Sequence, residues 1–165
     1  MVAFKINLAT DKDAPLLVRH RVNMWIAIRP DLMSQSDKMV DVTSNWIKKA
    51  MSEKRLVGFV VSEEESGTVA GSGCIWLTEE QPRFIETQLY SPYLISMYTE
   101  ENFRRRGVAK LIVQNAIDWC RAHGYNMINL QASEQGRSVY EHFGFKPTNE
   151  MRLILKMNPL LKNHG

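Results

Sequence analysis

The chain has few of the features that mark a metal site, a disulfide scaffold or a membrane span. Its two cysteines, Cys74 and Cys120, are far apart and form no CxxC pair, and no two histidines are spaced by four residues. The start has no basic segment followed by an apolar run, and no stretch approaches the roughly 20 apolar residues of a membrane span. We therefore expect buried free thiols, no metal and a cytoplasmic location.

An excess of charge and the common nucleotide motifs are also absent. The 21 basic and 18 acidic residues leave a net charge of +3, which is too small for a general nucleic-acid surface. Neither GxxxxGK[ST] nor GxGxxG occurs, so nucleoside triphosphates and dinucleotides are not the expected ligands. With 165 residues, 44% of them hydrophobic, the composition predicts one globular domain, residues 1–165.

The hydrophobic pattern predicts strands interleaved with helices. Predicted strands are Phe4–Leu8, Leu56–Ser62, Thr68–Thr78, one from Leu94 to Thr99, Met127–Ala132 and Met151–Met157. Predicted helices run from after Asp13 to about Ile28, and over Asp37–Lys54, Arg106–His123 and Gln135–Phe143. The turn EEESG predicts a β-hairpin, and residues 79–92 with two prolines predict a long loop. This β-α-α-β-β-β-α-β-α-β order implies an α/β fold with a mixed sheet and helices on both faces.

The most informative stretch is LISMYTEENFRRRGVAKLIVQNAIDWC, residues 94–120. It predicts a strand, a tight basic loop and a helix that begins near Gly107. A helix N-terminus presents unpaired N–H groups and partial positive charge, and a glycine there lets an anion approach the backbone. Ala109 keeps the first helical turn slim. The stretch therefore predicts a cradle for a phosphate group.

The pattern Arg104-x-x-Gly107-x-Ala109 after this strand resembles the [Q/R]-x-x-G-x-[G/A] motif of the GNAT superfamily of N-acetyltransferases. In that family the motif holds the pyrophosphate of acetyl-CoA. A second stretch, LQASEQGRSVYEHFGF at residues 130–145, is similar to the family's next strand, helix and aromatic-Gly-Phe ending. The resemblance implies a mostly antiparallel sheet that splays centrally, and acetyl-CoA as the acetyl donor.

The resemblance also implies which residues contact acetyl-CoA. The backbone of Met97, Tyr98 and Thr99 would follow the pantetheine arm, and an N–H near Met97 or Tyr98 would point at the thioester carbonyl. Ser133 stands where many members have an asparagine that contacts the pantetheine. The alternative is that the three arginines belong to a solvated surface loop that binds no phosphate. Expected around the pyrophosphate are Arg104, Arg105, Arg106, Gly107, Val108, Ala109 and Lys110.

Tyr140 aligns with the tyrosine that many members use to protonate the departing thiolate. A phenol with its usual pKa of about 10 is protonated at neutral pH and can donate that proton. The alternative is an aromatic residue packed in the core. The glutamate base of some members is replaced by Ile128, so the general base stays open among Glu134, Glu86, Glu100 and a water chain.

The resemblance implies that the acceptor is bound by the first two helices and the 79–92 loop. Candidate contacts are Trp25, Arg29, Asp31, Glu86 and Tyr90. The expected reaction is acetyl transfer to a primary amine of a small molecule or peptide in one ternary complex. The main alternative is a non-catalytic acyl-CoA-binding regulatory domain, and nucleic-acid binding through the arginines is disfavoured. A homodimer is possible, although no interface signature is present.

Overall fold

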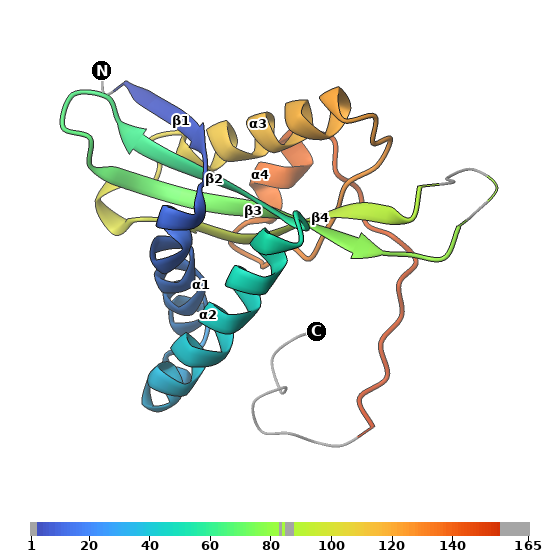
Figure 1. The fold of residues 1–165 in the computed structure, drawn as a ribbon, viewed down its shortest axis with the longest axis horizontal. Coiled ribbons are helices and arrows are strands. Elements are labelled where there is room, and N and C mark those ends of the chain that lie inside the picture. The colour runs from blue at the N-terminus through green and yellow to red at the C-terminus, as the bar shows by residue number, and fades with distance from the viewer. Residues whose placement is uncertain (1–2, 83, 85–87, 156–165) are drawn as a thin grey trace.

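The computed structural model describes residues 3–82, 84 and 88–155. A five-stranded sheet forms its centre, and its strands lie in the sheet in the same order as in the chain (Figure 1). The first three pairings are antiparallel and the last is parallel. The strands are β1 (Phe4–Leu8), β2 (Leu56–Glu63), β3 (Val69–Glu79), β4 (Tyr90–Thr99) and β5 (Asn129–Leu130).

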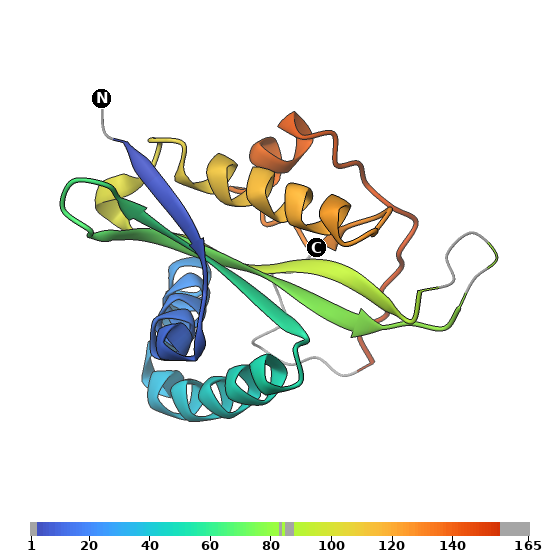
Figure 2. The same ribbon diagram turned by 45° about the horizontal axis from the view of Figure 1, so that its top comes forward.

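Helices cover both faces of this sheet, as the sequence predicts (Figure 2). One face carries α1 (Ala14–Ile28) and α2 (Ser36–Ser52), and the other carries α3 (Val108–Ala122) and α4 (Arg137–His142). Short 3-10 turns precede α1, α2 and the loop that leads to α3. Within the described ranges, no helix is both long and apolar enough to cross a membrane.

Two glycines in β3 explain how closely α3 packs on the sheet. A Cβ added to Gly71 would lie 2.8 Å from Val108 Cγ1, and one added to Gly73 would lie 2.7 Å from Ile112 Cγ2. Both distances are far below van der Waals contact, so a side chain at either position would push α3 away. The fully buried Ile112 and its neighbours on α3 then form a dense apolar core with β2 and β3.

The expected long loop at residues 79–92 is shorter in the structure. β3 extends to Glu79 and β4 begins at Tyr90, and the Glu80 N–H still donates to the Leu89 carbonyl oxygen at 2.8 Å. Pro92 lies within β4 opposite Leu77, before the pairing with β5 begins. A proline is tolerated there because β4 has a single neighbouring strand at that point. Residues 83 and 85–87 lie outside the described part.

The expected strands after α3 are only partly present. β5 has two residues where Met127–Ala132 was predicted, and residues 151–155 form no strand; 156 and 157 lie outside the described residues. The side chains of Met151 and Leu153 are 93% and 81% exposed. Alternation of apolar residues favours a strand only where a neighbouring strand edge supplies hydrogen bonds, and residues 151–155 have no such partner in the described chain.

Candidate active site

β4 carries a β-bulge close to its C-terminal end. Ser72 of β3 pairs with Tyr98 and Cys74 pairs with Ile95, so two β4 residues, Ser96 and Met97, lie opposite Gly73 alone. The bulge holds Ser96 at φ 57°, in the left-handed region. Such a bulge interrupts the ladder and turns backbone groups away from the neighbouring strand. Backbone N–H groups at this point of β4 are therefore placed to contact a ligand.

The other side of β4 is also open near the bulge. β5 pairs with β4 at only two positions, Tyr93 with Asn129 and Leu94 with Leu130. From Ile95 to Thr99, β4 has no ladder partner on that side among the described residues. The two strands therefore separate where the bulge begins, as the predicted splay of the sheet requires.

The loop between β4 and α3 turns sharply into the helix. Arg105 has φ 61° and Gly107 has φ 88°, and both values lie in the left-handed region. Gly107 is the N-cap residue, and no side chain caps the start of α3. A Cβ added to Gly107 would meet nothing within 4 Å, so the surface beside it is open. Val108, Ala109 and Lys110 thus begin a helix whose first N–H groups can receive an anion.

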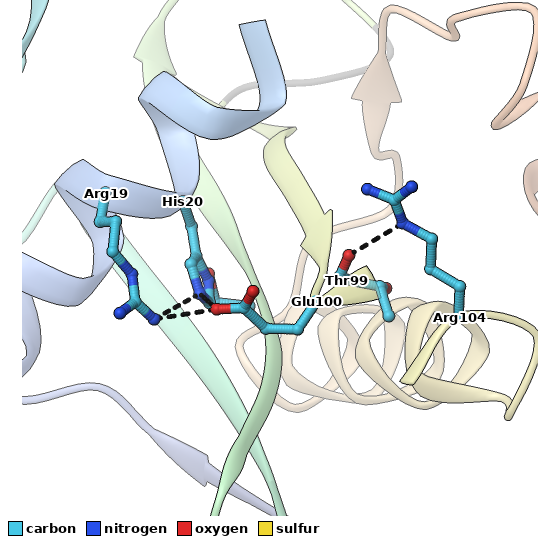
Figure 3. A network of polar contacts seen from close by, with 6 residues as sticks. Arg19, His20, Thr99, Glu100 and Arg104 are labelled. Atoms are coloured by element: carbon cyan, nitrogen blue, oxygen red, sulfur yellow. Dashed lines mark hydrogen bonds and ion pairs between the residues drawn. The ribbon is translucent and has the colours of Figure 1, made fainter. Parts of the chain in front are cut away.

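The arginine side chains brace this loop. Arg104 Nε donates to the Thr99 carbonyl oxygen at 3.3 Å (Figure 3). The Arg104 guanidinium also lies 3.9 Å from the Glu101 carboxylate. The Arg106 guanidinium lies over the Phe103 ring, 5.7 Å from its centre. These contacts of Arg104 and Arg106 hold the loop in shape.

Glu100, at the end of β4, is held by residues of α1 (Figure 3). Glu100 Oε1 lies 2.9 Å from Arg19 Nη2 and 3.0 Å from Nε2 of the fully buried His20. Nδ1 of His20 lies 2.7 Å from Ser72 Oγ. Because a carboxylate only accepts hydrogen bonds, Nε2 carries the proton of the neutral ring and Nδ1 accepts from Ser72. The network fastens α1 to the strand end from which the loop starts.

Burial lowers the pKa of His20 below its usual value, and the hydrogen bond to Glu100 opposes this effect only in part. No sequence motif indicated a role for His20. Its partners Ser72 and Glu100 are 52 and 80 residues away, so no local pattern could have indicated the network.

Tyr140 and Ser133 lie close together beside Gly136. Tyr140 Oη and Ser133 Oγ are 3.6 Å and 3.3 Å from the point where a Cβ of Gly136 would lie. Ser133 Oγ also accepts a hydrogen bond from the Gly136 N–H at 3.2 Å. Burial raises the pKa of the Tyr140 phenol, which keeps its proton on at neutral pH. The structure thus brings two sequence-predicted residues to one place.

The three carboxylates considered as a general base differ in their surroundings. Glu134 is exposed in the turn before α4, and Glu100 is bound by Arg19 and His20. Glu86 lies outside the described residues. Of the two candidates in the described part of the chain, Glu100 is therefore already engaged by Arg19 and His20, whereas Glu134 is exposed directly after Ser133.

The acceptor candidates are not gathered into one group. Arg29 binds Asp31 through two hydrogen bonds of 2.8 Å and 2.6 Å, which lower the pKa of the Asp31 carboxyl. Tyr90 lies under the Arg55 guanidinium at the far end of β4 from the phosphate loop. Trp25 contacts the guanidinium of Arg21, a residue that the sequence did not indicate.

An open pocket of about 490 Å³ lies between α1, the start of α2 and the end of β4. Its walls include Val22, Asn23, Met33, Tyr98 and Arg104. Tyr140 does not line it. The pocket therefore adjoins the phosphate loop on the α1 side of the sheet, away from the helix that carries Tyr140.

Both cysteines are buried free thiols, as expected. Burial raises the pKa of Cys74 and of Cys120 to about 12, so both remain protonated at neutral pH. A protonated thiol is a poor nucleophile, which disfavours a route through an acetylated cysteine.

Known proteins share both the sequence pattern and this fold. The sequence model of the acetyltransferase (GNAT) family matches residues 22–145. N-acetyltransferase 8 from Homo sapiens is 26% identical over 130 residues, which cover 77% of this chain and 55% of that protein. N-acetyltransferase 8B from Homo sapiens is 28% identical over 130 residues, covering 76% and 49%. The chain spans about half the length of these curated relatives.

Two solved structures are similar over almost their whole length. A GCN5-related N-acetyltransferase from Ralstonia eutropha JMP134 has 23% identity and a TM-score of 0.82, covering 93% of this chain and 99% of that one. A predicted acetyltransferase from Clostridium acetobutylicum, solved with acetyl-CoA, has 24% identity and a TM-score of 0.79, covering 98% and 100%. The structures share the fold, and the family match covers most of the sequence. The chain therefore belongs to the GNAT family of acetyltransferases.

Proposed function

We propose that the protein transfers the acetyl group of acetyl-CoA to a primary amine of a small molecule or peptide, by direct attack in a ternary complex. The observation that carries the proposal is the continuous path from the bulge at Ser96 to the uncapped start of α3 at Gly107. Along that path β4 has no ladder partner on one side among the described residues, and no side chain caps the start of α3. These two places would hold a thioester arm and a phosphate group, respectively. Acetyl-CoA carries both.

The phosphate end of acetyl-CoA would be bound by the β4–α3 loop. The N–H groups of Val108, Ala109 and Lys110 belong to the first turn of α3, where a helix has no internal acceptors for them, and no side chain caps this turn. The macrodipole adds partial positive charge there. Gly107 leaves open space beside them. Arg105 and Arg106 add formal charge close to the site.

The thioester end would lie beside the bulge, with Ser133 in contact with the pantetheine. An N–H of Met97 or Tyr98 donates to the carbonyl oxygen and stabilises the negative charge that develops there. The amine nitrogen attacks the carbonyl carbon, the new C–N bond forms and the C–S bond breaks. Holding both substrates in one complex makes this attack effectively unimolecular.

Tyr140 would supply the proton that the departing thiolate needs. Its phenol is protonated at neutral pH, and burial strengthens that state. The thiolate takes the phenolic proton and leaves as the thiol of CoA, while the amine loses its own proton to a base or water. Donation by a positioned acid contributes typically 10²–10⁴-fold to a rate.

The test combines calorimetric titration with acetyl-CoA and assays of CoA release across a panel of amines. We expect binding, turnover on at least one class of amine, and a kcat about a hundredfold lower in Tyr140→Phe with acetyl-CoA affinity unchanged. Tyr125→Phe, which alters another tyrosine of raised pKa, is the matched control and should keep full activity.

Three outcomes would count against the proposal. Binding of acetyl-CoA with no turnover on any amine would favour the non-catalytic regulatory domain. Absence of binding would refute the phosphate cradle itself. A Tyr140→Phe enzyme with undiminished kcat would show that another group protonates the thiolate.

A further inference from the structure

Arg21 is a partly buried cation on the side of α1 that packs against the sheet. One helical turn before it, a side-chain carbon of Leu17 lies 3.1 Å from the point where a Cβ of Gly58 would lie. Gly58 pairs with Cys74 of β3, and the Arg21 guanidinium is close enough to that cysteine to oppose, in part, the rise that burial causes in the pKa of its thiol. Arg21 therefore lies over the middle of the sheet, between α1 and β3.

This position is next to the bulge of β4. Cys74 pairs with Ile95, which immediately precedes the bulge residues Ser96 and Met97. Cys74 and Ile95 both belong to the apolar cluster on the α1–α2 face. Arg21 thus approaches the bulge from that face, whereas the phosphate loop lies beyond the end of β4. Its charge is separate from the proposed pyrophosphate site.

The described part of the structure supplies no acid to Arg21. The neighbouring arginines on α1 and after it are matched, Arg19 with Glu100 and Arg29 with Asp31. The contact found for the Arg21 guanidinium is with the Trp25 ring, whose centre is 5.4 Å away. The Cys74 thiol, with its pKa raised to about 12, is neutral and cannot balance the charge.

Burying a guanidinium without an anion is unfavourable, and burial accordingly lowers the pKa of Arg21. An anionic ligand would remove that cost. The aromatic ring contacts the guanidinium through a cation–π interaction and leaves N–H donors for a partner. The planar fork of an arginine matches the two oxygens of a carboxylate better than a lysine would.

We propose that Arg21 binds a carboxylate of the acceptor, so that the substrates are amines that also carry a carboxylate, as free amino acids do. The inference rests on the proposed function, because it assigns the acceptor of that same reaction. The amine would then lie on the α1–α2 face of the bulge, across from the helix that carries Tyr140.

The experiment compares matched pairs, each free amino acid with its amide, as acceptors for CoA release. The wild-type protein should prefer the acid of an accepted pair about tenfold or more, because a charged hydrogen bond is lost with the amide. In Arg21→Gln the ratio should fall to about one, with acetyl-CoA affinity in the calorimeter unchanged. Arg21→Lys should keep part of the preference, and Arg121→Gln, a change at an exposed arginine of α3 that is already paired with Asp118, should keep all of it.

Three results of the transfer assay would overturn the assignment: no acid preference in the wild type, a preference that survives in Arg21→Gln, or an Arg21-dependent preference for phosphoethanolamine over ethanolamine without one for amino acids. Failure of the proposed function would look different, as loss of acetyl-CoA binding and of CoA release on every amine. The amino acid and amide pairs are therefore also titrated directly into wild type and Arg21→Gln, with and without CoA. Binding of the acid that does not depend on Arg21 contradicts the inference whether or not transfer occurs.

Discussion

Two consecutive strand–loop–helix units of this protein match family motifs, but they are built very differently. The first has the ten-residue β4 and the fifteen-residue α3, which buries five residues. The second has the two-residue β5 and the six-residue α4, which buries none. The first presents the phosphate loop, and the second presents Ser133 and Tyr140.

The difference in burial predicts a difference in local stability between the two units. Burial of many apolar side chains gives a segment a high free energy of local unfolding, and a short, exposed segment opens more easily. The phosphate loop is therefore attached to a well-packed strand and helix, whereas the proposed acid, Tyr140, lies on a short helix with no buried residue. Ligand binding across both units should stabilise the second more than the first.

The largest expected effect concerns how much each helix contributes to the free energy of unfolding through its packed side chains. Val113 of α3 is fully buried and Val139 of α4 is only partly buried. We expect Val113→Ala to lower the free energy of unfolding by about 2 to 3 kcal/mol, and Val139→Ala by about 1 kcal/mol or less. Urea denaturation measures both. Equal losses would show that α4 is as firmly packed as α3.

The next effect separates backbone strain from ligand contact, since each unit has a glycine with the same conformation. Gly107 precedes α3 and Gly144 follows α4, both have φ 88°, and neither has an atom within 4 Å of an added Cβ. Changing either to alanine should cost about 1 to 2 kcal/mol of stability through left-handed strain. Acetyl-CoA affinity should fall about tenfold in Gly107→Ala only, because that loop must keep its shape to bind.

Calorimetric titration of both variants measures the affinity. If Gly144→Ala weakened acetyl-CoA binding as much as Gly107→Ala does, strain in general rather than the phosphate loop would explain the loss. If neither changed it, the cradle would not be the binding site.

The sequence predicted the helices of both units well, including Gln135–Phe143, which is observed at Arg137–His142, and it predicted the strands after α3 poorly, for one physical reason. The helix predicted at Arg106–His123 is observed at Val108–Ala122, because its apolar residues recur with the helical period and are buried. The strands predicted at Met127–Ala132 and Met151–Met157 depend on neighbouring strand edges, which a local pattern does not contain. The bulge in β4 was missed for the same reason, since it is defined by two β4 residues opposite Gly73.

The candidate site divides in a similar way. Local motifs indicated the phosphate loop and, through the resemblance, the pair of Ser133 and Tyr140 that the structure brings together. His20 and Arg21 carry no local signal, because their significance comes from burial and from partners more than 50 residues away in the chain. The signal that the sequence does contain is the presence of a histidine and an arginine within an otherwise apolar helical segment. This signal marks the two residues as unusual but does not identify their partners.

The smallest expected effect concerns the anchor that only the first unit has, the contact of Glu100 with His20 and Arg19. Burial lowers the pKa of folded His20 below its usual value of 6.5, so the unfolded chain binds the proton first as the pH falls. Stability conferred by neutral His20 is therefore complete above about pH 6.5 and declines below it, until the lower folded pKa is reached. Unfolding of wild type and His20→Gln, measured from pH 7.5 to 5, isolates this residue from the carboxyl groups common to both. The wild type should lose more stability over that range, and parallel curves would show that the anchor does not titrate.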